Sequence, residues 1–287
     1  SLITKENWCN HQRADWSFDT SDPAYQNLAD GQTRDLTVMY NVTDDNGATN
    51  NNSFTITLTG TNDAPVATFE FDQYTTEGNQ AIQGQLTSSD VDADDLASYS
   101  LLPSGIDPDG TNNSDPNIQA IADALAASTI PGEIPGLSIT PDGSWAFDPT
   151  QDIYQGLAAG EELVLKVNYQ AIDQIGGTGN NFFLITVTGT NDAPIATTTT
   201  NEYLKTTEED TATGLTITRE ELIRGITDID NRTIQSDGSY KYSTLQIAYI
   251  NSENGVFTEE NGKWSFTPNE KFNGIAEVKY GVDDGDG

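Results

Sequence analysis

The chain has 287 residues, which is enough for about two domains. Its 12 Lys and Arg stand against 45 Asp and Glu, which gives a formal net charge of −33 with one His. This charge argues against nucleic acid or an anionic membrane surface as a partner, because phosphate groups would be repelled. It is typical of a protein whose acids are neutralised by bound cations, or of one that works in high salt.

The apolar content of 35% is low for a globular protein and is shared with disordered chains. Aromatic residues nevertheless recur in register, which favours a folded protein. Cys9 is the only cysteine, so no intrachain disulfide can form. No apolar run approaches the roughly 20 residues of a membrane-spanning helix, so we expect no membrane insertion. No signal peptide begins at Ser1. The chain starts and stops within a repeated pattern, so we expect a segment of a longer protein.

Residues 1–65 are predicted to be the C-terminal part of a repeat. Alternating apolar and polar residues at 36–42, turn residues at 44–47 and a second alternating run at 53–60 predict an antiparallel hairpin. Shifting this segment by 129 positions aligns its aromatic, glycine and acidic residues with those of the next repeat. The aligned pairs are Trp16 with Trp145, Phe18 with Phe147, Tyr25 with Tyr154, Gly31 with Gly160, Tyr40 with Tyr169, and Asp44 with Asp173.

Residues 66–194 are predicted to be one complete repeat. Several short strands separated by Gly, Asn and Asp turns indicate a β-sandwich. The expected strands are 84–86, 96–102, 137–140, 144–148, 163–169 and 182–189. An insertion at 103–136 contains Asp115 and Pro116 as a helix start, followed by apolar residues at helical spacing up to about Ala127. We expect this short helix to close an edge or end of the sandwich.

Residues 195–287 are predicted to be a third repeat that lacks its last strand. Thr218 and Glu221 have the spacing of a capping box and predict a short helix. Strands are expected around 242–250, 255–258, 263–267 and 276–282. The Trp-x-Phe pair recurs here as Trp264 and Phe266, and its recurrence in every repeat predicts core packing rather than sugar stacking.

The hexapeptide Gly-Thr-Asn-Asp-Ala-Pro connects these repeats. It occurs at 60–65 and again, identically, at 189–194. A sequence that ends one β-unit and begins the next is a joint between repeats. The proline fixes its own φ and keeps the preceding residue extended, so the joint is predicted to be stiff. We call 60–65 the first joint and 189–194 the second joint.

Acidic residues recur at equivalent places in the repeats. Glu77 and Glu208 follow the joints, Asp-x-Asp pairs come next, Glu161 lies mid-repeat, and Asp173 and Asp283 close the last strand pair. The Asp-x-Asp runs are Asp90, Asp92 and Asp94 in one repeat and Asp228 and Asp230 in the next. Two carboxylates on a short loop suit a hard cation such as Ca²⁺, which takes six to eight oxygen ligands. Without a cation these acids would repel one another at close range.

This order of motifs resembles cadherin and cadherin-like domains, and the joint resembles that of bacterial VCBS repeats. Residues 195–287 resemble the cadherin-like repeats of giant RTX adhesins. The resemblance implies all-β, tandem cadherin-like (Ig-like) Greek-key sandwiches in an elongated array, with Ca²⁺ shared between neighbouring repeats. It also implies type I secretion and an extracellular place at a bacterial cell surface.

Carried over residue by residue, the resemblance assigns metal ligands at both joints. The first joint would use Asp63 with Asp90, Asp92 and Asp173. The second would use Glu77, Glu161 and Asp192 with Asp228, Asp230 and Asp283. Backbone carbonyls of Asn62 and Asn191 could join, and Asp94 and Glu208 are further candidates.

Three positions depart from the family pattern. Animal cadherin linkers open with an acid where this chain has Gly60 and Gly189, and they carry Asn where it has an alanine. Gln32 stands where Glu161 stands in the next repeat. The first joint is therefore expected to bind fewer ions than the second, or to bind them more weakly.

No catalytic motif stands out, and we expect no enzyme activity. The resemblance implies a calcium-rigidified extender of a large bacterial adhesin that supports adhesion or biofilm formation. Its partners would be neighbouring repeats, with host or surface glycans or proteins bound by other domains, and the particle would be a monomeric rod. The alternatives are a carbohydrate- or peptide-binding module that uses the 103–136 insertion, accessory repeats of a secreted enzyme, and a filament subunit completed by strand addition.

Overall fold

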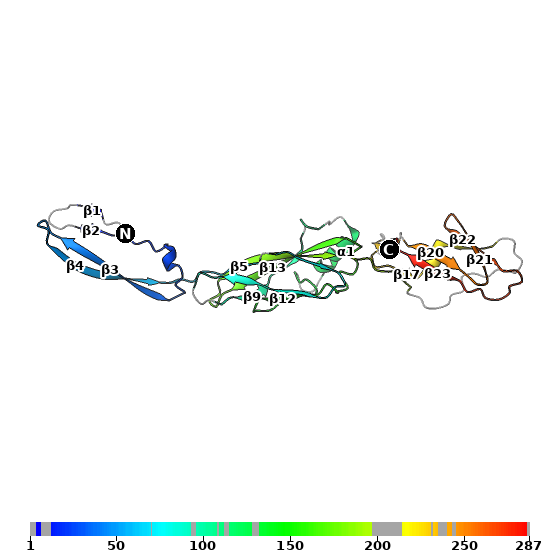
Figure 1. The fold of residues 1–287 in the computed structure, drawn as a ribbon, viewed down its shortest axis with the longest axis horizontal. Coiled ribbons are helices and arrows are strands. Elements are labelled where there is room, and N and C mark those ends of the chain that lie inside the picture. The colour runs from blue at the N-terminus through cyan, green and yellow to red at the C-terminus, as the bar shows by residue number, and fades with distance from the viewer. Residues whose placement is uncertain are drawn as a thin grey trace.

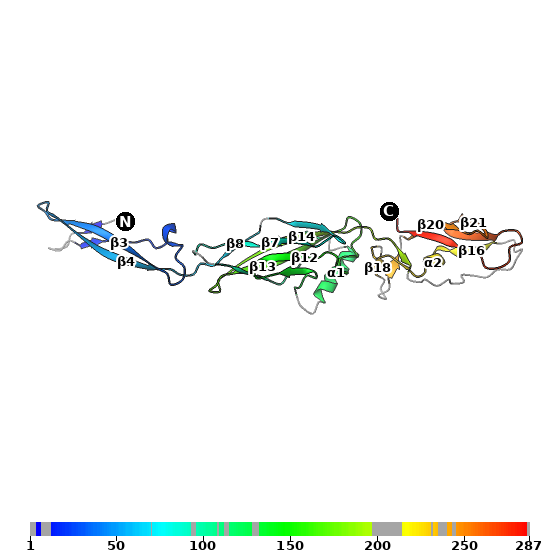
Figure 2. The ribbon, with the colours of Figure 1, turned by 60° about the horizontal axis from the view of Figure 1, so that its bottom comes forward.

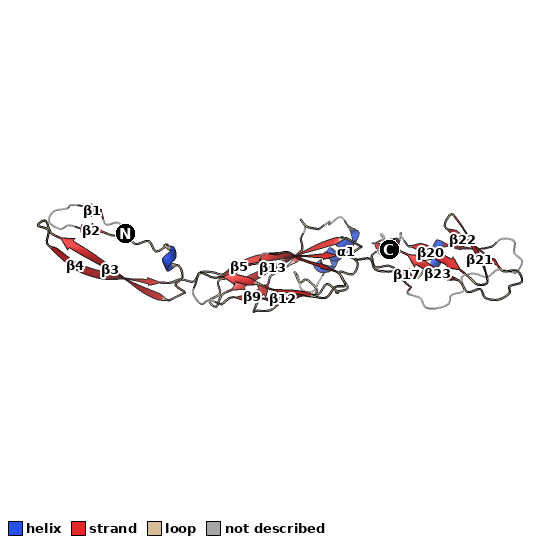
Figure 3. Ribbon diagram, viewed as in Figure 1, coloured by secondary structure: helices blue, strands red, loops and turns tan. Residues whose placement is uncertain are grey.

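The computed structural model describes most of the chain. The described residues are 4–6, 13–69, 71–92, 96–107, 109–111, 115–127, 132–196, 214–230, 232–234, 240–242 and 245–285. Three strand-rich parts follow one another along the long axis (Figure 1). Strands dominate every part, and the helices are short (Figure 3). The predicted all-β fold class is confirmed.

The N-terminal part is built around one long hairpin. Strands β3 (Thr33–Thr43) and β4 (Thr49–Thr59) pair antiparallel from Thr33 opposite Thr59 to Thr43 opposite Thr49. Asp44 forms the predicted turn, since its side chain accepts hydrogen bonds from the backbone of Asn46 and Ala48. The other elements here are β1 (Thr4–Glu6), β2 (Arg13–Asp15) and the 3₁₀ helix η1 (Pro23–Tyr25).

Trp16 differs from its counterpart in the central part. Its side chain is 56% exposed and contacts Phe54 at a ring-centroid distance of 5.1 Å. Among the described strands, β3 and β4 pair only with each other. The prediction of core packing for Trp-x-Phe is therefore wrong at Trp16.

The central part is a sandwich of two main sheets. One sheet has the order β10-β13-β14-β6, with β9 also paired to β13, and the other has the order β11-β12-β7. A separate pair joins β5 to β8. The strands are β5 (Val66–Thr68), β6 (Gln73–Thr76), β7 (Ile82–Gln85), β8 (Thr87–Ser89), β9 (Ser98–Leu101), β10 (Gly105–Ile106), β11 (Leu137–Ile139), β12 (Ser144–Phe147), β13 (Glu162–Ile172) and β14 (Thr178–Thr188).

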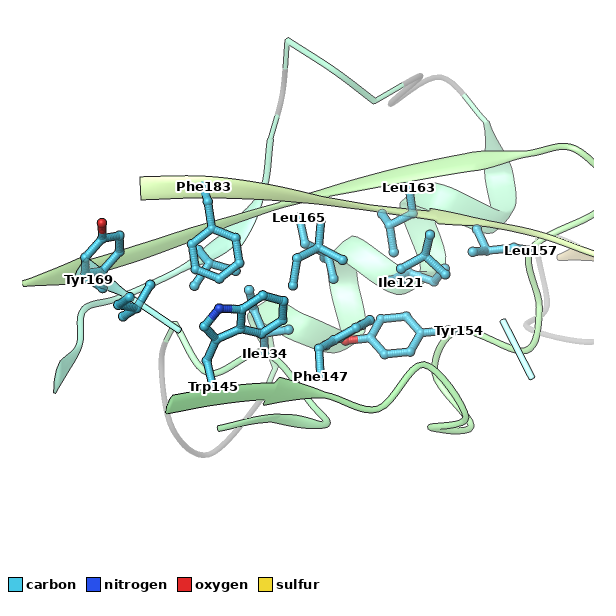
Figure 4. Close-up of a cluster of buried hydrophobic side chains, with 14 of the residues drawn as sticks. Ile121, Ile134, Trp145, Phe147, Tyr154, Leu157, Leu163, Leu165, Tyr169 and Phe183 are labelled. Carbon is cyan, nitrogen blue, oxygen red and sulfur yellow. The ribbon is translucent and has the colours of Figure 1, made fainter. Parts of the chain in front are cut away.

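The core lies between these sheets (Figure 4). Alternate residues of β13, from Leu163 to Ala171, are fully buried, because a strand turns every second side chain toward the same face. Trp145 and Phe147 of β12 face them and are 3% and 0% exposed. Each fully buried side chain of this kind contributes roughly 1.5–3 kcal/mol to folding.

The predicted helix in the insertion is α1 (Pro116–Ala126). Ile118 and Ile121, three residues apart, are buried in the same core as Trp145 and Phe147. The helix therefore closes part of the sandwich, as its apolar spacing predicted.

The C-terminal part contains several small sheets. One has the order β16-β22-β21, and the others pair β20 with β23, β15 with β17, and β18 with β19. The predicted capping box is confirmed at α2 (Arg219–Leu222), where the side chains of Thr218 and Glu221 each accept the backbone N–H of the other residue. Ile217, Leu222 and Phe266 are buried. The strands are β15 (Ile195–Ala196), β16 (Leu215–Thr218), β17 (Ile226–Thr227), β18 (Arg232–Ile234), β19 (Tyr240–Tyr242), β20 (Gln246–Asn251), β21 (Gly255–Glu260), β22 (Lys263–Pro268) and β23 (Lys279–Asp283).

Candidate metal centres at the two joints

Both joints have the same backbone geometry. The Gly60 N–H donates to the Gln32 carbonyl at 2.8 Å, and the Gly189 N–H donates to the Glu161 carbonyl at 2.8 Å. A Cβ at Gly60 would lie 2.1 Å from the Leu28 carbonyl oxygen, and one at Gly189 would lie 2.2 Å from that of Ala158. No side chain fits there, which explains why glycine replaces the acid of animal cadherin linkers.

At the first joint, the asparagine and aspartate of the hexapeptide bind acids of the central part. The Asn62 side-chain amide donates to Asp173 Oδ2 at 2.8 Å, and the Asp63 N–H donates to Asp92 Oδ2 at 2.8 Å. The Asp92 N–H in turn donates to Asp90 Oδ1 at 2.9 Å. Four acids and one amide, from segments up to 111 residues apart, therefore meet at this joint.

Asp173 is further fixed by the turn that follows it. Its Oδ1 accepts the N–H groups of Ile175, Gly176 and Gly177 at 2.6–2.8 Å. The Asn62 amide holds the pKa of Asp173 below its ordinary value, and these backbone N–H groups add to the effect. The carboxylate is therefore kept charged and aimed at the joint.

The second joint repeats this pattern. The Asn191 amide donates to Asp284 Oδ2 at 3.1 Å, and the Asp192 N–H donates to Asp230 Oδ2 at 2.5 Å. The Asp230 N–H donates to Asp228 Oδ1 at 3.0 Å. The Asn-Asp dipeptide thus holds one Asp-x-Asp loop and one strand-end acid at each joint.

Asp284, and not the predicted Asp283, occupies the strand-end position. Asp284 is 4% exposed, whereas the Asp283 side chain is exposed and accepts the Gly285 N–H at 2.6 Å. Strand β20 has a register shift between Ile247 and Tyr249, opposite β23, and such bulges are not visible in a sequence pattern. One signal was available, because Asp284 follows Tyr280 by four residues, as Asp173 follows Tyr169.

Two glutamates of the central part lie at the second joint. Glu77 is 4% exposed, and its Oε1 accepts the Thr190 N–H at 2.6 Å. Burial raises the pKa of Glu77 to about 7, and the charges of Asp230 and Asp192 contribute to the shift. Glu161 Oε2 accepts the Ala158 N–H at 2.8 Å. Glu77 therefore places a carboxylate of the central part near Asp192 and Asp230 of the second joint.

Asp230, on the C-terminal side of the second joint, is also buried near other carboxylates. It is 4% exposed, and burial raises its pKa to about 6. The nearby carboxylates of Asp192, Asp228 and Asp284 raise it as well. Burial and the neighbouring charges together raise the pKa values of Glu77 and Asp230, so ionising both groups costs free energy in the folded protein.

Several buried oxygens at the joints accept no hydrogen bond. In the described part of the chain they include Asn62 Oδ1, Asp90 Oδ2 and Asp92 Oδ1 at the first joint, and Glu77 Oε2 and Asn191 Oδ1 at the second. Buried polar atoms are nearly always paired, so such atoms call for a ligand. Carboxylate and amide oxygens are the donors that Ca²⁺ prefers. The residues at both joints therefore fit a hard divalent cation.

The side chains alone do not yet form a metal cage. Among the described residues, no three His, Cys, Asp or Glu side chains converge closely enough to hold a metal ion. Amide and backbone oxygens would have to complete each ligand set. Two predicted ligands, Asp94 and Glu208, lie outside the described residues.

Part of the chain is similar to known protein domains. Residues 190–287 match the family model of the cadherin-like domain. The chain is also similar to the calcium-binding lectin RapA2 of Rhizobium johnstonii, with 28% identity over 177 residues, or 61% of this chain and 68% of that protein. The VCBS subtype stays a prediction from the sequence.

Solved cadherin structures are similar as well. A structure of protocadherin gammaB7 domains EC3-6 matches 98% of this chain and 60% of its own, with 16% identity and a TM-score of 0.44. A structure of mouse cadherin-23 EC22-24 matches 94% of this chain and 76% of its own, with 14% identity and a TM-score of 0.46. The chain thus spans about 60% of the length of the protocadherin structure.

Among the helices that the structure describes, none is long and apolar enough to cross a membrane.

Proposed function

We propose that this chain is a calcium-rigidified extender segment of a large secreted or surface-anchored bacterial adhesin. One observation carries the proposal: the same asparagine, aspartate and Asp-x-Asp contacts recur at both joints and leave buried oxygens without a donor. The cadherin-like match of residues 190–287 and the similarity to a calcium-binding lectin support an extracellular, calcium-binding, adhesion-type module.

The proposed ligand sets follow the contacts. The first set is Asn62, Asp63, Asp90, Asp92 and Asp173. The second set is Glu77, Glu161, Asn191, Asp192, Asp228, Asp230 and Asp284, and Asp94 and Glu208 remain candidates. We also propose the division into repeats at 1–65, 66–194 and 195–287, since the joints at 60–65 and 189–194 separate the three parts (Figure 1).

Mechanical stiffness is the proposed result of binding. Calcium would supply the positive charge that clustered carboxylates need, and it would stabilise the folded joints by mass action. The residues themselves fix the geometry: Asp63 and Asp192 tie each joint to an Asp-x-Asp loop, and Glu77 connects Thr190 with the acids beyond it. Affinities of about 10⁻⁴–10⁻³ M are typical of extracellular calcium modules.

The test combines thermal unfolding with small-angle scattering, in millimolar Ca²⁺ and in excess chelator. We expect calcium to raise the melting temperature and to narrow the spread of end-to-end lengths toward an extended rod. Magnesium at the same concentration is the control for ionic strength, and it should have a smaller effect because it demands octahedral geometry. If neither melting nor shape responds to calcium, the proposal is wrong.

Carbohydrate binding is a second candidate function, because a relative of this chain is described as a lectin. A glycan array read with calcium and with chelator tests it. The sugar-binding site would then lie in the 103–136 insertion. Ile118 and Ile121 of that insertion lie in the core, so point variants at its exposed residues are preferable to deletion.

A further inference from the structure

The two joints share a backbone but differ in the turn that supports them. At the first joint the Gln32 N–H donates to the Ala29 carbonyl at 2.9 Å, and at the second the Glu161 N–H donates to the Ala158 carbonyl at 2.9 Å. Gln32 and Glu161 also accept the equivalent glycine N–H groups of their joints. They therefore occupy the same structural position, and the second joint has a carboxylate where the first has a neutral amide.

The environment of these two side chains differs too. Glu161 is partly buried and its carboxylate is held by the Ala158 N–H, whereas Gln32 is exposed. Asp30, the nearest acid in the first turn, stands where the second turn has Ala159, and its side chain is exposed. The first joint therefore has no charge at the position where the second joint has Glu161, and no buried acid of the same turn replaces it.

The proximity of a helix and a strand from neighbouring parts also distinguishes the second joint from the first. Helix α1 of the central part lies against β18 of the C-terminal part, across the second joint (Figure 2). In the described residues, no strand or helix of the N-terminal part makes a comparable contact with the central part. The second joint therefore has support that does not depend on a bound cation.

From these two differences we infer that the joints respond to calcium unequally and that the first joint is the calcium-dependent hinge of this segment. The inference rests on the proposed function, because it concerns the regulation of the same sites. Calcium affinity follows the number of charged ligands, so the second joint should become ordered at a calcium concentration on the order of tenfold lower than the first. At intermediate calcium the segment bends at 60–65 while 189–194 stays extended.

The experiment measures the two joints separately by pulsed spin-label distances. Cys9 is the only cysteine, so a Cys9→Ser background leaves the introduced labels unique. One label pair, Thr37→Cys with Ser138→Cys, spans the first joint. The other, Ser138→Cys with Thr258→Cys, spans the second, and all three positions are exposed. Calcium is titrated from excess chelator to millimolar concentrations.

We expect the distance distribution across the second joint to narrow at a lower calcium concentration than the distribution across the first joint. In chelator, the distribution across the second joint should also be the narrower of the two. Gln32→Glu should move the transition of the first joint to lower calcium by about tenfold, and Glu161→Gln should move that of the second to higher calcium by about the same factor. Gln83→Glu, an exposed position on β7, controls for added charge and should move neither.

The outcomes separate this inference from the proposed function. If both joints become ordered at the same calcium concentration, or if Gln32→Glu leaves the first joint unchanged, the joints are equivalent and the inference fails while the proposed function stands. If neither distribution responds to calcium, the proposed function fails and the hinge fails with it.

Discussion

Asp230→Asn should change the stability of the protein in opposite directions with and without calcium. The substitution keeps the shape of the side chain and the carbonyl-type oxygen that accepts the Asp192 N–H. It removes one negative charge from a site where burial, and then the charges of Asp192, Asp228 and Asp284, raise the pKa of Asp230. Without calcium this relieves repulsion, and with calcium it removes a charged ligand.

The expected magnitude follows from the shifted pKa. A pKa of about 6, against an ordinary value of 3.8, corresponds to about 3 kcal/mol that opposes ionisation in the folded protein. Because solvent screens these charges, we expect the substitution to raise the free energy of unfolding by only about 1 kcal/mol. In chelator near neutral pH, Asp230→Asn should therefore raise the melting temperature of the C-terminal part by about 4–8 °C. With calcium at about 100 times the dissociation constant, binding contributes about 2.7 kcal/mol, and the variant should lose most of this.

The assay is differential scanning calorimetry of the wild-type chain and the variant, in chelator and in calcium. Several transitions are expected, so each is followed separately rather than fitted as one two-state unfolding. Asp283→Asn is the matched control, since it removes the same charge from an exposed side chain of the same part. If Asp230→Asn lowers the melting temperature equally in both conditions, Asp230 is a structural residue and the reasoning from charge crowding is refuted.

Three further predictions concern other residues of the joints. Asp284→Asn should weaken calcium binding at the second joint, whereas Asp283→Asn should leave it unchanged. Isothermal titration calorimetry compares calcium binding by the two variants. Equal effects would contradict the assignment of Asp284. Gly177→Ala should disrupt the first joint without removing an acid, because its Cβ would lie 2.3 Å from Asp173 Oδ2, and Gly105→Ala, whose Cβ meets nothing within 4 Å, is the control; unaltered calcium binding in Gly177→Ala would argue against Asp173 as a ligand. Glu77 has a folded-state pKa of about 7, above its ordinary 4.5, so its contribution favours folding at low pH and is lost as the pH rises through about 7. The melting temperature in chelator should therefore fall between about pH 4.5 and pH 7, and calcium should reduce this fall. A melting temperature in chelator that stays constant over this range would show that the pKa of Glu77 is not raised.

Much of the local structure could be predicted from the sequence because its signals are local. A side chain alternates faces every two residues in a strand, so the apolar pattern at 163–169 predicted β13 and its buried face. The capping box at Thr218 needs only a residue three positions later, and the structure contains it. The chemistry of the joints was equally visible, since Asn62, Asp63, Asn191 and Asp192 all occur in the repeated hexapeptide.

Only the tertiary structure decided which acids meet and which remain in solvent. Asp283 is exposed and Asp284 is buried, although the two are adjacent in sequence. The exposure of Trp16 likewise depends on what the folded chain packs against it, which its local sequence does not show. The sequence determined the acids and amides that are candidate ligands and the strands that present them. The raised pKa of Glu77, the buried oxygens without a donor and the contact of α1 with β18 arise from residues far apart in the chain, so they exist only once the chain has folded.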